Sequence, residues 1–133
     1  MATALRPLQT AIYAKATASS ALMSRISGLY DEVPEPAAFP YVSFGSITET
    51  RDDAHDHQGL DVVVTLDIWS KAPGFGQAYD VFAALDAALD RVPLAVAGFT
   101  DVSIRHEQHE AMRDPDPDVR HISAQYRVTL TAV

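Results

Sequence analysis

The sequence predicts an α+β fold in which a mostly antiparallel sheet has helices packed on one face. Two observations carry this prediction. Several segments place apolar residues at every second position, which is typical of strands with one covered face. Two other segments repeat apolar residues every three to four positions, as amphipathic helices do. The expected order is helix, strand, strand, helix, strand, strand (α-β-β-α-β-β) in a single domain spanning residues 1–133.

The first element is expected to be a helix with Pro7 near its start, where a missing N–H costs little. Ser19 and Ser20 are candidate caps for a short second turn, which Gly28 ends. Three prolines between Asp31 and Pro40 then predict an extended connector. The apolar positions that define these two helical segments are Leu5, Leu8, Ile12, Ala16, Leu22 and Ile26.

The first pair of strands is expected at Tyr41–Thr50 and around Leu60–Ile68, separated by a polar break at Arg51–Gln58. The second of these strands carries the clearest signal in the chain. Its even-numbered positions from Leu60 to Ile68 are all apolar, so that face is predicted to be core. The other face is partly polar and carries Asp61, Val63, Thr65, Asp67 and Trp69.

A second helix is expected from about Phe75 to Arg91, after the turn Lys71–Gly74 and before Pro93. Two further strands follow. One contains Val102 and Ile104, and the other alternates strictly from Ile122 to Leu130. The turn between them, Asp114–Asp118, holds two prolines that cannot join the middle of a sheet. Both strand pairs are therefore expected to be hairpins.

Composition argues against several classes of function. The formal net charge is −8 and the ten lysines and arginines are scattered, so nucleic-acid binding as a main activity is not expected. The chain has no cysteine, no Gly-x-Ser-x-Gly nucleophile motif and no glycine-rich phosphate loop. No secretory signal or bilayer-length apolar run is visible, so a soluble protein made inside the cell is expected. We predict that the chain is not an enzyme and uses no cofactor.

The best candidate for a chemical site is the run from Asp52 to His57, which offers carboxylate and imidazole ligands (Asp52, Asp53, His55, Asp56, His57). Such a run specifies little geometry, and it falls at the expected tip of a hairpin. A solvated polar turn is therefore the preferred interpretation, and no metal site is predicted. The alternative is a small metal- or ligand-binding α+β dimer that uses this loop.

Three histidines, His106, His109 and His121, come from strands expected to pair. Alternation places His109 on the opposite face of its strand from His106, so a shared three-histidine site is not expected. Asp86 and Asp90 lie four residues apart on the second helix and are expected to be solvated charges.

Trp69, together with Tyr41, has two open interpretations. The ring of Trp69 is either an aromatic at the edge of the core or an anchor in an interface, where Trp and Tyr are enriched.

Several segments together are similar to a known family. The opening helix leads to Leu29-Tyr30-Asp31-Glu32-Val33-Pro34, then to Phe39-Pro40-Tyr41-Val42-Ser43-Phe44-Gly45 and Leu66-Asp67-Ile68-Trp69-Ser70. From about Leu5 to Leu130 the chain resembles the small tail-completion (tail terminator) proteins of long-tailed phages and of phage-like gene transfer agents.

The resemblance implies a structural virion component without catalytic residues. It implies a subunit of a closed ring, expected to hold six copies, that caps the tail tube and joins it to the head connector. The implied partners are other copies of the chain, the major tail tube protein and a connector or stopper protein, with DNA only as passing cargo. The expected location is the head-proximal end of a particle tail. Candidate contact residues lie in the two hairpin loops and at Trp69: Arg51, Asp52, Asp53, His55, His57, Trp69, Arg113, Asp114, Asp116 and Asp118.

Overall fold

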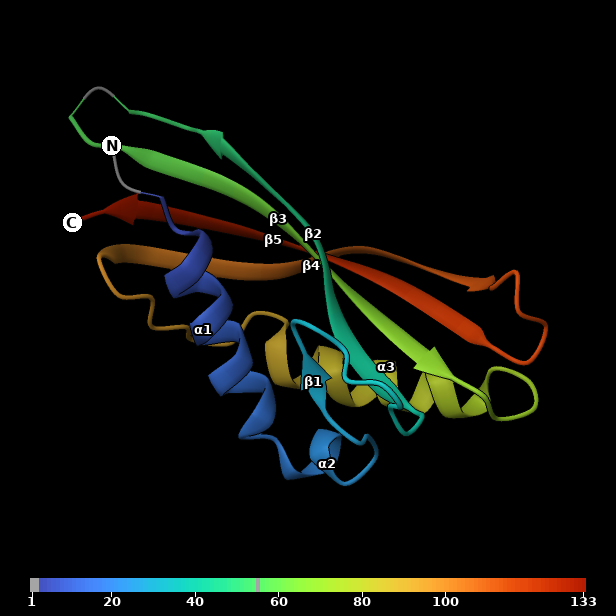
Figure 1. Cartoon of the computed structure of the whole chain (residues 1–133). Helices are drawn as coiled ribbons and strands as arrows, with labels where there is room; N and C mark the ends of the chain where they lie inside the picture. The colour runs from blue at the N-terminus through green and yellow to red at the C-terminus, as the bar shows by residue number, and fades with distance from the viewer. Residues whose placement is uncertain (1–2, 55) are drawn as a thin grey trace.

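The computed structural model describes residues 3–54 and 56–133, and it shows the expected α+β architecture. Helices α1 (Leu5–Thr17), α2 (Ser20–Met23) and α3 (Gly76–Leu89) lie against one face of a five-stranded sheet (Figure 1). The strands are β1 (Leu29–Tyr30), β2 (Tyr41–Arg51), β3 (Gly59–Ser70), β4 (Phe99–Arg113) and β5 (Arg120–Ala132). Their order in the sheet is β1-β2-β3-β5-β4.

The sheet is antiparallel except at its short first strand. β2 and β3 form one hairpin, β4 and β5 form the other, and β3 pairs with β5 along its whole length. Among the strands of the described residues, β1 alone runs parallel to its neighbour, opposite Val42 and Ser43 of β2. This two-residue strand lacks any alternation, so the sequence alone did not predict it.

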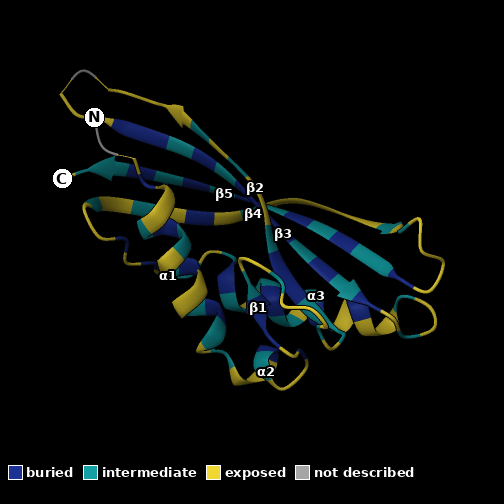
Figure 2. Ribbon diagram, viewed as in Figure 1, coloured by how far each residue is buried: buried dark blue, intermediate teal, exposed yellow. Residues whose placement is uncertain are grey.

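The core lies between the helices and the sheet, as the alternation on β3 predicts. Leu60, Val62, Val64, Leu66 and Ile68 are at most 3% exposed. Their neighbours on β5 are the even-numbered residues from Ile122 to Leu130, which are buried on the same face. Figure 2 shows this alternation of buried and partly exposed positions along both central strands. The register predicted from the sequence is confirmed.

The helices bury most of the apolar positions that their periodicity predicts, but the prediction is wrong for Leu5, which is 41% exposed at the start of α1. Ser19 caps α2, because its hydroxyl accepts a hydrogen bond from the backbone N–H of Leu22 at 3.2 Å. On α3 the fully buried residues are Ala78, Val81, Leu85 and Leu89. Phe82, next to Val81, is partly buried and packs against this core. None of the described helices has the length and hydropathy that a membrane span requires.

Candidate assembly surfaces

The hairpin loop between β2 and β3 is a solvated polar turn in its described part. The Arg51 side chain lies 3.8 Å from Asp53, and Asp53 also accepts a hydrogen bond from the backbone N–H of Gly59 at 3.2 Å. Asp52 and His57 are exposed; the His57 ring lies 3.1 Å from the neighbouring Asp56, and the backbone of His57 forms a bridge with Ala54. His55 lies outside the described residues. Within the described chain no three potential ligands converge on a metal-sized site.

The turn between β4 and β5 is organised by its own aspartates. Asp114 accepts from the N–H of Asp116, and Asp116 accepts from the N–H of Asp118, each at 3.0 Å. These two successive turns, with a proline after each of the first two aspartates, give the tip of the hairpin a defined shape. Arg113 at its base lies over the Phe75 ring at the start of α3, 5.3 Å from the ring centre.

The two loops lie at opposite ends of the sheet. Arg51 is paired with Leu60, which is paired with Leu130, so the first loop lies at the C-terminal end of β5. Arg113 is paired with Arg120 at the start of β5, beside the end of β3. Figure 1 shows the first loop on the left and the second on the right. The sequence-derived contact candidates therefore form two separate groups.

Trp69 belongs to the group at the right-hand end and is tightly held. Its indole stacks on the His121 ring with centroids 3.9 Å apart, and its N–H donates to the hydroxyl of Ser43 at 3.0 Å. The Nε2 atom of His121 in turn lies 2.7 Å from the carboxylate of Asp67. These groups lie on the face of the sheet opposite the described helices, which we call the uncovered face. Trp69 is therefore a half-buried aromatic on an open face, which keeps both of its sequence-based interpretations possible.

Other aromatic residues gather at the same end. Tyr41 contacts both Tyr30 and Phe39, with centroids 5.9 and 5.0 Å apart, and Lys71 lies 4.7 Å over the Phe39 ring. Burial and then the nearby charge of Asp114 raise the pKa of the Tyr41 hydroxyl. We call this region the aromatic end and define it as Tyr30, Phe39, Tyr41, Trp69, Phe75 and Tyr79.

The prediction that His106 and His109 lie on opposite faces of their strand is wrong. The β4–β5 register shifts between His106 and Gln108, leaving Glu107 as an extra residue that reverses the alternation. His106 and His109 therefore lie on the same face, with ring nitrogens 2.9 Å apart, and His109 packs on Phe82 of α3. His121 lies on the other face, with Asp67.

The prediction that Asp86 and Asp90 are solvated charges is also wrong. The Asp86 carboxylate accepts a hydrogen bond at 2.9 Å from the hydroxyl of Tyr126, whose side chain is completely buried. Burial and then the charge of Asp86 raise the pKa of that hydroxyl far above its usual value. Asp90 accepts from the backbone N–H of His106 at 2.7 Å. Both carboxylates fasten α3 to the sheet.

The uncovered face carries an ion-pair cluster that sequence reasoning missed. The Arg127 guanidinium bonds both carboxylate oxygens of Asp61, at 2.8 to 3.2 Å, and also reaches Glu107 at 3.2 Å. The Arg127 hydrogen bond lowers the pKa of Asp61, and Asp61 in turn raises the pKa of Arg127. The sequence did carry a signal for this pair, because Asp61 and Arg127 occupy outward-facing positions on two strands in which apolar and polar residues alternate. Pairing occupies this arginine, so it is not presented freely to a phosphate.

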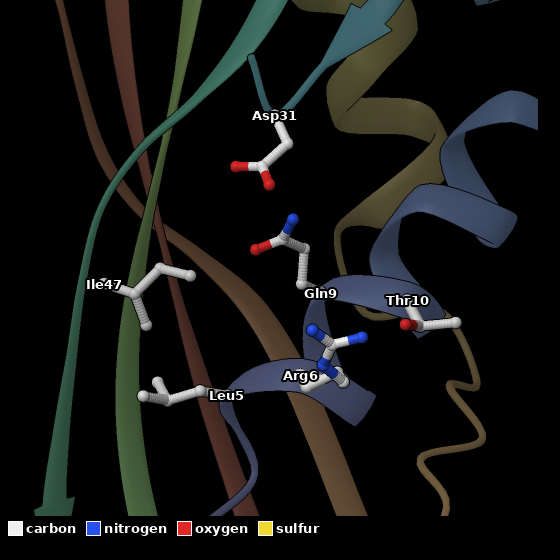
Figure 3. A pocket seen from close by; sticks show the side chains of 6 residues that line it. All are labelled: Leu5, Arg6, Gln9, Thr10, Asp31 and Ile47. Carbon is white, nitrogen blue, oxygen red and sulfur yellow. The ribbon is translucent and has the colours of Figure 1, made fainter.

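A shallow groove of about 440 Å³ opens on the other side of the sheet, between α1 and the outer edge of β2 (Figure 3). Leu5 and Ile47 give it an apolar wall, and Asp31 and Gln9 place polar groups above that wall. The remaining lining residues are Arg6 and Thr10. The groove is open to solvent along its length.

Comparison with known proteins decides the family. The model of the family described as tail completion protein gp17 matches residues 10–131, which is nearly the whole chain. The chain belongs to this family. It is therefore a structural tail protein by descent, and the sequence-based resemblance is confirmed.

One solved structure extends the comparison to three dimensions. A chain of a structure titled "Virion of native gene transfer agent (GTA) particle" superposes with a TM-score of 0.92 at 25% identity. The superposition covers 99% of this chain and 100% of that one. A search of curated proteins finds no match. The whole tail-completion fold is thus the same as that of a subunit found in an assembled particle.

Proposed function

We propose that this protein is the tail terminator of a phage-like particle, a subunit of a six-membered ring that ends the tail tube and joins it to the head connector. The observation that carries the proposal is the end-to-end match to a chain of a gene transfer agent virion, together with the family match over residues 10–131. The protein would be made in the bacterial cytoplasm and would reside at the head-proximal end of the tail.

The two different ends of the sheet suit this task. A tail tube grows by stacking identical rings, so each exposed ring end templates the next one. A terminator must match that end on one face and present a different surface on the other. Here one end carries the polar loop Arg51–Gln58, and the other carries the aromatic end and the rigid turn Arg113–Asp118. These two groups are the proposed contacts with tube and connector.

The same chemistry suits DNA as passing cargo. The net charge of −8 repels phosphate, and Arg127 on the uncovered face is neutralised by Asp61 and Glu107. A channel wall made of this face would present mainly hydroxyl, amide and carboxylate groups to DNA, with the exposed Arg105 close enough to Asp61 to lower its pKa.

Deletion of the gene tests the proposal. We expect heads filled with DNA that are not joined to tails, and tails of abnormal length, when particles are examined by electron microscopy. A variant in which the turn Asp114–Asp118 is shortened to a two-residue turn should fold and yet weaken docking to one partner, because that turn lies outside the core. Joined, transfer-competent particles with normal tails in the deletion strain would rule the proposal out.

A further inference from the structure

The sheet has two unpaired edges. On β4 the C-terminal end of α3 occupies part of the edge, because the N–H of Arg91 donates to the carbonyl of Ile104 at 2.9 Å and Asp90 accepts from the N–H of His106. Beyond that point the outer edge of residues 107–113 has no backbone partner among the described residues. Five consecutive side chains there, 107–111, are exposed.

The second unpaired edge is on β2, at the opposite side of the sheet. β1 pairs only with Val42 and Ser43, so the outer edge of residues 44–51 has no neighbouring strand in the described chain. The groove of Figure 3 lies beside this edge, on the helix side, against Ile47. Unpaired edges of this length are templates for strand addition, and soluble proteins normally protect them.

The strand directions make the two edges complementary. β2, β3, β5 and β4 are each antiparallel to the next. A rotation about an axis along the strands preserves their direction, so β4 of one copy would lie antiparallel to β2 of the next copy. From this we infer that a second copy of the chain occupies each edge, with the Glu107–Arg113 edge of β4 pairing with the Phe44–Arg51 edge of β2. The inference rests on the proposed ring and assigns its subunit contact.

The offset between the edges agrees with the geometry of a closed wall. The midpoint of the β4 edge is Glu110, which pairs with Ser123 of β5, and Ser123 pairs with Asp67 of β3. The midpoint of the β2 edge lies near Thr48, which pairs with Val63 of β3. The two midpoints are therefore offset by the four positions from Val63 to Asp67. Four positions along a strand correspond to about 13 Å, and four strands are about 19 Å wide. Joining the edges therefore tilts the strands by about 35°, at the lower end of the range found in barrels.

The resulting ring would have its helices outside and the uncovered face inside. Six copies supply 24 long strands, and at this tilt they enclose a wall about 45 Å in diameter at the backbone. Side chains reduce the channel to about 35 Å, which is wider than a DNA duplex. The groove beside β2 would receive the helix-side residues of the incoming strand, His109 and Ala111, which are level with the buried Ala124 and Ile122.

Disulfide trapping in assembled particles tests the contact, because the chain contains no cysteine. Thr48→Cys or Thr50→Cys is combined with Gln108→Cys or Glu110→Cys, which gives four pairs of exposed positions on the uncovered face. A disulfide needs Cα atoms roughly 4.4–6.8 Å apart, so only directly neighbouring strands react. The control pairs Thr48→Cys with Asp80→Cys on the exposed side of α3.

We expect at least one of the four pairs to give a ladder of covalent oligomers, up to the closed ring, on a non-reducing gel of oxidised particles. The control pair should remain monomeric. Joined particles that contain the variants but show no ladder with any pair would overturn the edge contact and leave the terminator function standing. A wild-type chain that is absent from joined particles would instead refute the proposed function itself.

Discussion

Replacement of Leu66 tests the buried face of β3 most sharply. Leu66 is completely buried at the middle of the strand, between Phe44 of β2 and Ala124 of β5. Leu66→Ala removes three carbon atoms from a packed site, and such changes cost about 2–5 kcal/mol. Leu66→Asp also buries a carboxyl group without a partner, which adds several kcal/mol. A domain of this size is stable by about 5–15 kcal/mol, so the aspartate variant should not fold.

Urea denaturation followed by circular dichroism measures the effect. With a slope of about 1.5–2 kcal/mol per molar urea, Leu66→Ala should lower the midpoint by roughly 1–3 M. The matched control is Val63, a half-exposed residue on the uncovered face of the same strand. Val63→Ala should cost less than about 1 kcal/mol and Val63→Asp should still fold. A Leu66→Asp protein that folds with unchanged melting would show that the assigned register is wrong.

Three further predictions concern polar groups. Asp53→Ala combined with His55→Ala should change stability by only about 0.5 kcal/mol, as surface substitutions do. Titration calorimetry of the wild type should show no tight zinc binding. A large loss of stability in the variant that zinc restores would instead support the metal-binding dimer. Tyr126→Phe should cost about 1–2 kcal/mol, because it leaves Asp86 without its donor. Tyr126 titrates near pH 10 in the unfolded chain and well above that in the folded protein, so the stability of the wild type should fall as pH rises past about 10. The Tyr126→Phe variant should lose less stability over this range. Equal losses of stability at alkaline pH in the two proteins would contradict this. The pKa of Asp61 is lowered in the folded protein, so its pairing with Arg127 stabilises the protein above the unfolded pKa of about 4, and this stabilisation is lost as pH falls. The Asp61→Asn variant should therefore be less stable than wild type at pH 7, and the two free energies of unfolding should become equal in acid. A difference in stability that stays constant as pH falls would refute this.

The strands and the core were predictable because they depend on local alternation. Leu60–Ile68 and Ile122–Leu130 each have one apolar face, and the structure buries both. The family resemblance was predictable for a different reason, since it depends on short sequence segments between Leu29 and Ser70.

Other features depend on three-dimensional packing and could not be predicted. An extra residue, Glu107, brings His106 and His109 to one face, and no composition signal marks such a bulge. The partners of Asp86 and Asp90 depend on how α3 is rotated against the sheet. The offset of the two unpaired edges emerges only from the full strand register, which joins residues far apart in sequence.

Electron cryomicroscopy of intact particles would show where in the tail the chain lies and how its copies are arranged. We expect a single ring of six copies between the last ring of the tail tube and the head connector, with the helices outward and β4 of each copy beside β2 of the next. Density for this chain at the distal end of the tail, or in an arrangement other than a closed ring, would contradict it.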